Sequence, residues 1–268
     1  MDAPVARASD RWNQGSAYEP FIGRWSRLVA VEFLSWLGLA PGGRWLDVGC
    51  GTGALTATIL EQGTPSQVKG IDPAPAFAAF ARAQLTDPRA AFAVGEAQQL
   101  PELDASYDAV VAGLVLNFVP EPARALEEMS RVVRPGGTVA GYVWDYAGGM
   151  ELLRYFWDAA AALDPQAGAL DEGQRFPLCA PAALTDLFRD AGLHEVEAWA
   201  IEVPTVFRDF ADYWNPFLGG QGPAPGYALS LSDDRRATLR QRLERTLPIA
   251  SDGMIRLTAR AWAVRGQR

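Results

Sequence analysis

The sequence predicts an α/β fold with a doubly wound, mostly parallel sheet, helices on both faces and helical insertions. Short apolar runs alternate with helical stretches between residues 44 and 144, and a glycine cluster follows the first run. Short buried strands that alternate with helices form parallel sheets, because each helix crosses back over the sheet. Two later segments alternate polar and apolar residues and predict a terminal antiparallel pair.

Each element has its own sequence signal. Apolar residues at three- and four-residue steps over 18–39 predict one or two N-terminal helices, which end at Pro41-Gly42-Gly43. The predicted strands are residues 44–48, 68–71, 91–94, 107–112, 138–144, 195–203 and 254–264. The predicted helices after the first strand are residues 54–61, 74–85, 122–133, 150–163 and 181–191.

The composition argues against several classes of function. The 268 residues carry a net charge of -8, and the basic residues form no patch that would bind nucleic-acid phosphates. Cys50 and Cys179 lie far apart, so neither a disulfide framework nor a metal site is predicted. The N-terminus lacks a signal-peptide pattern, and Glu32 interrupts the apolar stretch 28–40. We therefore expect a cytoplasmic monomer or homodimer that acts on a small molecule, with no nucleic-acid or membrane partner.

The turn after the first strand is the strongest candidate for a binding site. Ligands of open doubly wound sheets bind beyond the carboxyl ends of the strands. Gly49 to Gly53 permit a tight turn and a close ligand, and the next helix offers its N-terminus to an anionic group. The run 49–54 also satisfies the dinucleotide-binding pattern. Asp72, 23 positions after Gly49, suits the ribose hydroxyls of either a dinucleotide or another nucleoside.

Asp47 separates these alternatives, because a carboxylate there repels a pyrophosphate but helps to hold a cationic amino group. The run Leu46 to Gly53 (LDVGCGTG) resembles the first motif of class I S-adenosylmethionine-dependent methyltransferases. Four further segments resemble later motifs of that family: GIDP (70–73), GEAQQLP (95–101), YDAVV (107–111) and RVVRPGG (131–137). The resemblance covers about residues 44–145. Asn117 is followed by Phe-Val-Pro and does not match the Asn-Pro-Pro-Tyr motif of amino-group methyltransferases.

The resemblance implies a Rossmann-like sheet of seven strands in the order 3-2-1-4-5-7-6, with S-adenosylmethionine as the cofactor. It also implies a division of the chain into six parts. These are an N-terminal helical cover (1–40), the cofactor-binding core (41–145), a helical insertion (146–180), a core helix with strand six (181–204), a second helical insertion (205–253) and the last strand (254–268).

Carried over position by position, the resemblance assigns three acidic residues to the cofactor. Asp47 would orient the amino group, Asp72 would hold the ribose hydroxyls, and Glu96 would face the adenine amino group where the family usually has Asp. The other expected cofactor neighbours are Gly49, Cys50, Gly51, Thr52 and Gly53 at the methionine part, Pro73, Ala97, Gly113 and Leu114 nearby, and Tyr18 and Arg27 at the carboxylate. Cys50 needs no reactive role there.

The implied reaction is direct displacement of a methyl group onto an O, N or C atom of a small, apolar or aromatic acceptor. Alignment is then the main catalytic contribution, and a general base is optional. Tyr142, Asp145 and Tyr146, near the carboxyl end of the fifth strand, are the candidate basic or orienting groups. Packing of Tyr142 in the sheet and turn capping by Asp145 are the structural alternatives. His194, the only histidine, lies at the amino end of the sixth strand, where a structural role is expected.

Two other functions remain open from the sequence. An NAD(P)-dependent oxidoreductase would use the same glycine turn, although the chain has no Tyr-x-x-x-Lys pair. A non-catalytic protein would keep the fold and the cofactor. Aromatic residues of the insertions form either a lid over an apolar acceptor or an ordinary helical core. They are Tyr155, Phe156, Trp157, Phe207, Phe210, Tyr213, Trp214 and Phe217.

Overall fold

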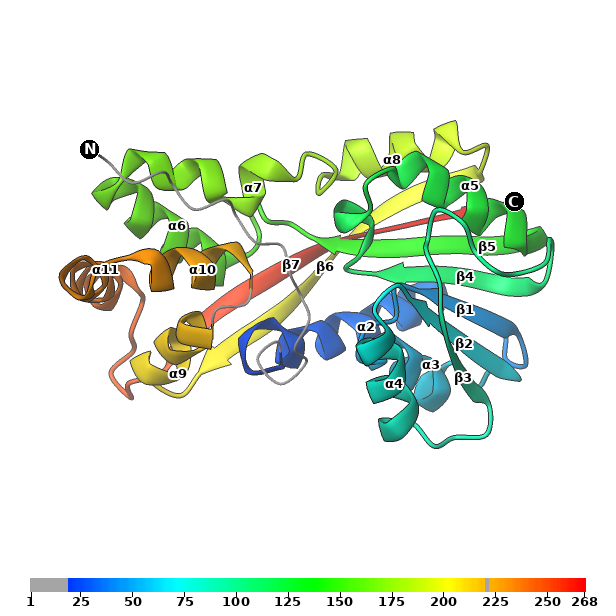
Figure 1. The fold of residues 1–268 in the computed structure, drawn as a ribbon, viewed down its shortest axis with the longest axis horizontal. Helices are drawn as coiled ribbons and strands as arrows, with labels where there is room; N and C mark the ends of the chain where they lie inside the picture. The colour runs from blue at the N-terminus through cyan, green and yellow to red at the C-terminus, as the bar shows by residue number, and fades with distance from the viewer. Residues whose placement is uncertain (1–18, 220–221) are drawn as a thin grey trace. The chain divides into compact units, whose positions relative to one another are not determined.

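A computed structural model describes residues 19–219 and 222–268 and contains a seven-stranded sheet in the order β3-β2-β1-β4-β5-β7-β6 (Figure 1). Strands β1 to β5 pair in parallel, whereas β7 pairs with β5 in the antiparallel sense. The predicted fold class, strand order and terminal antiparallel element are confirmed.

The strands are β1 (Arg44–Val48), β2 (Gln67–Asp72), β3 (Ala90–Val94), β4 (Tyr107–Gly113), β5 (Val133–Trp144), β6 (His194–Phe207) and β7 (Ile255–Gln267). The α-helices are α2 (Arg24–Leu37), α3 (Ala54–Gln62), α4 (Pro75–Gln84), α5 (Pro122–Val132), α6 (Glu151–Leu163), α7 (Glu172–Arg175), α8 (Pro181–Asp190), α9 (Phe210–Trp214), α10 (Pro223–Ser230) and α11 (Asp233–Thr246). A π-helical turn (Glu19–Gly23) and three 3-10 helices (Leu116–Phe118, Pro165–Leu170 and Asn215–Gly219) complete the described elements.

Strand β5 begins earlier than the sequence predicts. Proline and glycine at 135–137 indicated a turn before a strand at 138, but Val133 already pairs with Tyr107. The register then shifts before the ladder resumes at Ala109 and Thr138. Gly136 has a φ of 75°, a conformation that favours glycine, so the turn residues form an irregularity inside the strand.

The chain divides into two compact units, named here by their content. The sheet unit comprises residues Ser26–Trp144, Leu178–Ile201 and Ala261–Arg268. The helical unit comprises the described residues of 1–25, Asp145–Pro177 and Glu202–Arg260. Strands β6 and β7 each contribute residues to both units.

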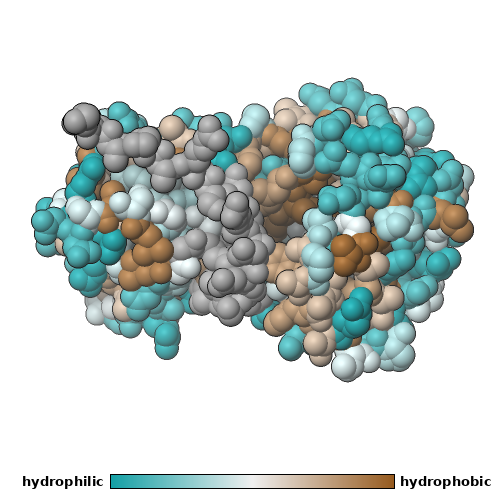
Figure 2. Space-filling model, viewed as in Figure 1, coloured by the Kyte–Doolittle hydropathy of each residue, from teal (hydrophilic) through white to brown (hydrophobic). Residues whose placement is uncertain are grey.

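Helices cover both faces of the sheet unit (Figure 1): α2, α3 and α4 lie on one face, and α5 and α8 on the other. Helix α5 illustrates why helices cover the sheet. It has one apolar face, on which the fully buried residues at three- and four-residue steps are Ala125, Leu126, Met129 and Val132. Hydrophilic residues cover the outer surface over α5 and α8 in Figure 2. Glu128 is the exception on the buried face of α5, with only 6% of its surface exposed.

The helical unit has an aromatic core of its own. Phe156 stacks on Phe217 with ring centroids 4.5 Å apart, and Tyr213 lies 5.4 Å from Phe217. The Tyr213 hydroxyl donates a hydrogen bond to the backbone oxygen of Leu152 at 2.9 Å. Six of the eight aromatic residues singled out in the sequence are buried, namely Phe156, Trp157, Phe207, Tyr213, Trp214 and Phe217. Ordinary packing therefore accounts for these six rings.

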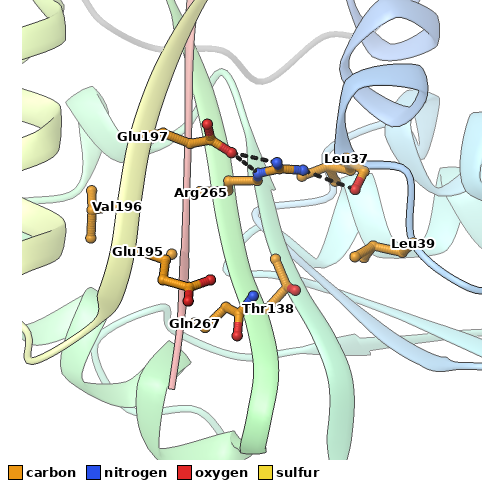
Figure 3. A pocket seen from close by; sticks show the side chains of 9 residues that line it. Leu37, Leu39, Thr138, Glu195, Val196, Glu197, Arg265 and Gln267 are labelled. Atoms are coloured by element: carbon orange, nitrogen blue, oxygen red, sulfur yellow. Dashed lines mark hydrogen bonds and ion pairs between the residues drawn. The ribbon is translucent and has the colours of Figure 1, made fainter.

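Arg265 lines a cavity of about 490 Å³ in the sheet unit (Figure 3). Its guanidinium donates hydrogen bonds to the backbone oxygens of Trp36 at 3.1 Å and Leu37 at 3.0 Å, and it pairs with Glu197. A cation is favourable at the C-terminus of a helix, where backbone oxygens lack helical partners. Thr138 and Gln267, which also line the cavity, pair at the start of the β5 ladder, opposite the carboxyl end. Arg265 thus fastens α2 to β6 and β7 away from the glycine turn.

Replacing Arg265 with Ala is expected to lower the free energy of unfolding by about 1–3 kcal/mol, because two helix-terminal oxygens and Glu197 lose their donor. Urea denaturation followed by circular dichroism measures the change. Arg256→Ala is the matched control, since Arg256 also lies on β7 but forms an exposed ion pair with Asp252, and it should change stability much less than Arg265→Ala does. Equal losses in the two variants would contradict the assigned role of Arg265.

Candidate cofactor and active site

The turn between β1 and α3 requires glycine at three positions. Gly49, Gly51 and Gly53 have φ values of 72°, 53° and 88°, a region that side chains rarely adopt. Space is also limited, because a Cβ on Gly49 would lie 2.5 Å from Cγ2 of Val115. The Gly49 N–H donates to the backbone oxygen of Ile71 at 2.7 Å, which ties the turn to β2. The sequence thus builds a rigid turn whose backbone a ligand can approach closely.

Asp47 is a buried carboxylate at the start of this turn, with 1% of its surface exposed. Its Oδ2 accepts a hydrogen bond from the Thr56 hydroxyl at 2.7 Å, whereas its buried Oδ1 has no partner among the described residues. Burial raises the pKa of Asp47 to about 7, and the nearby charge of Asp72 raises it further, while Thr56 opposes the shift. An unpaired buried carboxylate oxygen is unfavourable and suits a cationic ligand group.

Asp72 ends β2 next to the glycine turn. Its Oδ2 accepts a hydrogen bond from the Gly51 N–H at 2.9 Å, and its Oδ1 accepts one from the Ala74 N–H at 2.8 Å. Burial raises its pKa, the two N–H groups oppose this, and the charge of Glu96 adds to the rise. Each carboxylate oxygen retains a further lone pair, so Asp72 can hold the turn and still accept hydrogen bonds from hydroxyls of a ligand.

Glu96 follows β3, the neighbour of β2, and its side chain is exposed. The Gly95 N–H donates to the backbone oxygen of Asp72 at 3.2 Å, and this contact brings the ends of the two strands together. Pro73 and Ala97 flank the same edge and are exposed and half-buried, respectively. The ends of β1, β2 and β3 therefore present Asp47, Asp72 and Glu96 on one edge of the sheet.

The end of β4 completes this edge. The Leu114 N–H donates to the backbone oxygen of Tyr142 at 2.8 Å, and Leu114 has a φ of 60°, which is unusual for a branched side chain. A Cβ on Gly113 would lie 2.7 Å from the Tyr142 hydroxyl, so glycine makes room for that ring. Gly113 and Leu114 are both half-buried.

Asn117 lies in the 3-10 helix that follows β4. Its amide Nδ2 is buried and has no partner among residues 19–219 and 222–268. A buried amide without a partner is unfavourable in the free protein, which makes Asn117 a candidate contact to a ligand. The mismatch with the Asn-Pro-Pro-Tyr motif did not point to this role. The signal that the sequence offered was a polar residue shortly after the end of a strand.

The three candidate basic groups lie in different surroundings. Tyr142 is buried in the sheet unit, with its ring centroid 4.7 Å from that of Phe33. Asp145 belongs to the helical unit, where Arg260 donates from Nε at 2.8 Å and the Gly148 N–H donates at 3.1 Å. Tyr146, in the same unit, packs with its ring centroid 5.8 Å from that of Phe176. Both Asp145 oxygens are thus engaged in a structural contact, as the capping alternative describes.

The remaining candidates are placed as follows. Arg27 is exposed on α2, and Tyr18 lies outside the described residues. Cys50 is buried with Ala81 and Phe92, and burial raises the pKa of its thiol, which disfavours the reactive thiolate. His194 is exposed and begins β6, one residue before the predicted strand.

In the part of the chain that the structure describes, no group of three or more His, Cys, Asp or Glu side chains is arranged to hold a metal ion. Over the same residues, no helix combines the length and apolar character that crossing a membrane requires.

The strand order and the acidic strand ends around a glycine turn define the Rossmann-like fold of class I methyltransferases. Residues 46–141 match the family described as methyltransferase domain. The resemblance drawn from the motifs is confirmed.

Curated relatives share this region. An uncharacterized methyltransferase of Mycobacterium tuberculosis is 40% identical over 114 residues, 42% of this chain and 44% of the relative. Trans-aconitate 2-methyltransferase of Methylobacterium radiotolerans is 33% identical over 175 residues, 63% of this chain and 65% of that protein. The chain thus matches less than half the length of the mycobacterial relative and under two thirds of the second.

A solved structure extends the likeness of the fold. Haemonchus contortus phosphoethanolamine N-methyltransferase 2, in complex with phosphomonomethylethanolamine and S-adenosylhomocysteine, aligns with a TM-score of 0.59. The alignment covers 94% of this chain and 56% of that one at 15% identity, so it supports the fold alone.

Asp47 makes the stability of the free protein depend on pH. Its pKa of about 7 in the folded state exceeds the ordinary value of 3.8, so its stabilising contribution is complete below pH 3.8 and is lost as pH rises through 7. Between these values, unfolding free energy should fall by up to about 1.4 kcal/mol per pH unit from this group. Asp47→Asn removes the titration.

Urea denaturation of both proteins from pH 5 to 8 measures this effect. The difference in unfolding free energy between Asp47→Asn and the unchanged protein should shift in favour of the variant as pH rises. A difference that stays constant over this range would show that Asp47 titrates normally in the folded protein.

Proposed function

We propose that this chain is an S-adenosylmethionine-dependent methyltransferase that methylates an O, N or C atom of a small molecule by direct displacement. The observation that carries the proposal is the buried Oδ1 of Asp47, which has no hydrogen-bond partner among the described residues and lies beside a glycine turn whose backbone a ligand can approach. A ligand that brings a positive charge to this position supplies the missing partner.

The residues at the strand ends fit the cofactor group by group. Asp47 would hold the cationic amino group, and N–H groups at the start of α3 would donate hydrogen bonds to the carboxylate. Asp72 would accept hydrogen bonds from the ribose hydroxyls, and Glu96 one from the adenine amino group. Gly113 and Leu114 would flank the nucleoside. When bound, S-adenosylmethionine supplies a methyl group activated by its positively charged sulfur.

The charge of the site favours this cofactor over a dinucleotide. The charge of Asp72 raises the pKa of Asp47, and the charge of Glu96 raises that of Asp72, so neighbouring carboxylates along this edge repel one another. A pyrophosphate would add two negative charges to this edge, whereas a sulfonium and an ammonium group relieve the repulsion. The same argument disfavours the oxidoreductase alternative.

The chain contributes to catalysis by alignment. The rigid turn and the end of β4 would fix the cofactor, and the Asn117 amide is the candidate group to orient the acceptor. Asp145 is committed to Arg260 and Gly148, so we assign it no proton transfer. Tyr142 remains the candidate orienting hydroxyl beside Gly113. Methyl transfer then needs no general base unless the acceptor must lose a proton before it attacks.

The acceptor is proposed only as a small molecule. The aromatic rings that suggested an apolar or aromatic acceptor are largely buried in the core of the helical unit, so they do not argue for one. The relative named for trans-aconitate shares 33% identity over part of its length, and its acceptor is one member of the panel to test.

Isothermal titration with S-adenosylmethionine, S-adenosylhomocysteine and NAD tests the cofactor. The first two should bind, and NAD should not. Asp72→Ala should weaken both by about tenfold or more, because hydroxyl contacts to a charged group are lost. Asp87→Ala is the control, since that half-buried carboxylate pairs with Arg89 before β3. Tight binding of NAD, or unchanged binding by a folded Asp72→Ala protein, would overturn the proposal.

Transfer of a labelled methyl group to a panel of small acceptors separates the enzyme from a non-catalytic cofactor-binding protein. We expect label in at least one acceptor and S-adenosylhomocysteine as the other product. Asn117→Ala should lower turnover by about tenfold with little change in cofactor affinity, since it loses one orienting hydrogen bond. Cofactor binding without transfer to any of a broad set of O, N and C nucleophiles would favour the non-catalytic alternative.

A further inference from the structure

Glu128 is a buried carboxylate that the proposed cofactor site does not use. It lies on the otherwise apolar buried face of α5 with 6% of its surface exposed. Arg131, one turn later, donates hydrogen bonds from Nε to its Oε1 and from Nη2 to its Oε2, both at 2.8 Å. This two-pronged pairing holds both side chains in one orientation and offsets the loss of solvent around the carboxylate.

The Glu128–Arg131 pair forms hydrogen bonds with the backbone of the segment after β3. Glu128 Oε2 accepts a hydrogen bond from the Leu100 N–H at 2.9 Å, and Arg131 Nη2 donates one to the Leu100 oxygen at 3.0 Å. Arg131 Nη1 donates to the backbone oxygen of Glu102 at 2.8 Å. The backbone N–H and the backbone oxygen of Leu100 are therefore both bonded to a single ion pair, and the Leu100 side chain is buried.

A short turn connects Glu96 to Leu100. The Gln99 N–H donates to the Glu96 oxygen at 3.1 Å, and residues 96 and 99 form an isolated β-bridge. Pro101 packs so tightly that a Cβ on Gly95 would lie 3.1 Å from its ring. The Glu96 side chain itself is exposed, so the backbone of this turn, rather than side-chain packing, sets its direction.

The ion pair stays charged over the ordinary pH range. Arg131 lowers the pKa of Glu128, and Glu128 and Asp104 raise the pKa of Arg131. The contact is therefore a permanent structural constraint.

We infer that Glu128 and Arg131 are positioning residues that hold the 95–102 segment so that Glu96 recognises the amino group of the cofactor's base. The inference rests on the proposed function, because it takes the base to lie at Glu96. It gives α5 a role in specificity although neither side chain is assigned a contact with the cofactor.

Two S-nucleosylhomocysteines that differ only at the base test the inference. S-adenosylhomocysteine carries the amino group, and S-inosylhomocysteine carries an oxygen in its place. The unchanged protein should prefer the adenosine form, because a carboxylate accepts a hydrogen bond from an amino group and repels a carbonyl oxygen. Isothermal titration of the full chain gives both dissociation constants.

Glu128→Gln and Arg131→Lys are the test variants, because each keeps most of the side-chain volume but breaks the paired geometry. Each should reduce the preference for the adenosine form by about tenfold, through weaker binding of that form and nearly unchanged binding of the inosine form. The Arg124–Glu127 pair supplies matched controls, since it has the same spacing on α5 but is exposed. Arg124→Lys and Glu127→Gln should leave the preference unchanged.

A merely structural role predicts a different result. It would weaken both ligands equally, or lower the melting temperature without changing the preference, and either result in folded Arg131→Lys and Glu128→Gln would overturn the inference. Equal affinity of the unchanged protein for the two forms would also overturn it while leaving the proposed function intact. Failure of the unchanged protein to bind either form would instead remove the proposed function, and the inference with it.

Discussion

Three carboxylates lie on one edge of the sheet despite their mutual repulsion, and the candidate site depends on this constraint. Burial raises the pKa of Asp47 and of Asp72, and each is raised further by the next acid in the series. Backbone N–H groups partly compensate Asp72 at its two oxygens. Thr56 partly compensates Asp47, but the buried Oδ1 of Asp47 has no hydrogen-bond partner among the described residues. Such an arrangement is least unfavourable when a cation is present, and this is the physical basis for proposing a positively charged ligand.

The glycine turn is fixed by contacts with residues of neighbouring strands. Asp72 accepts the Gly51 N–H, while Gly49 donates to Ile71 on the same strand. A larger residue at Gly49 would collide with Val115 beyond β4. The turn is therefore held from β2 and confined from the β4 side. Its shape is set by neighbours that are distant in sequence, and a ligand meets a surface that is already formed.

Much of the fold could be predicted because its signals are local. Alternation of strands and helices, a glycine turn and proline-glycine breaks each act over a few residues, and they identified the five parallel strands, whereas the strand order came from the resemblance to the methyltransferase family. The start of β5 was misplaced because Gly136 sits in an irregular ladder rather than in a free turn. Local sequence patterns do not reveal with which strand the residues of such an irregularity pair.

The polar partners of the site could not be predicted for the same reason. Asp145 was a candidate basic or orienting group, and its contact with Arg260, 115 positions away, could not be read from the sequence. Asn117 was set aside because its motif failed, although its buried amide lacks a partner among the described residues. Sequence shows which side chains have suitable chemistry, but whether that chemistry is already satisfied depends on contacts between remote segments.

Helix α5 shows how such remote contacts build a site. The helix begins shortly after the 3-10 turn that carries Asn117, and its later turns hold the Leu100 peptide. The end of β4 and the segment after β3 are therefore mounted on one helix, although β2 and β1 lie between their strands in the sheet. A helix buried on Leu126 and Met129 moves as a rigid element. The 3-10 turn with Asn117 and the segment after β3 are both attached to this helix, so they cannot move independently of each other. Catalysis by alignment depends on such fixed positions of the residues that contact the cofactor and the acceptor.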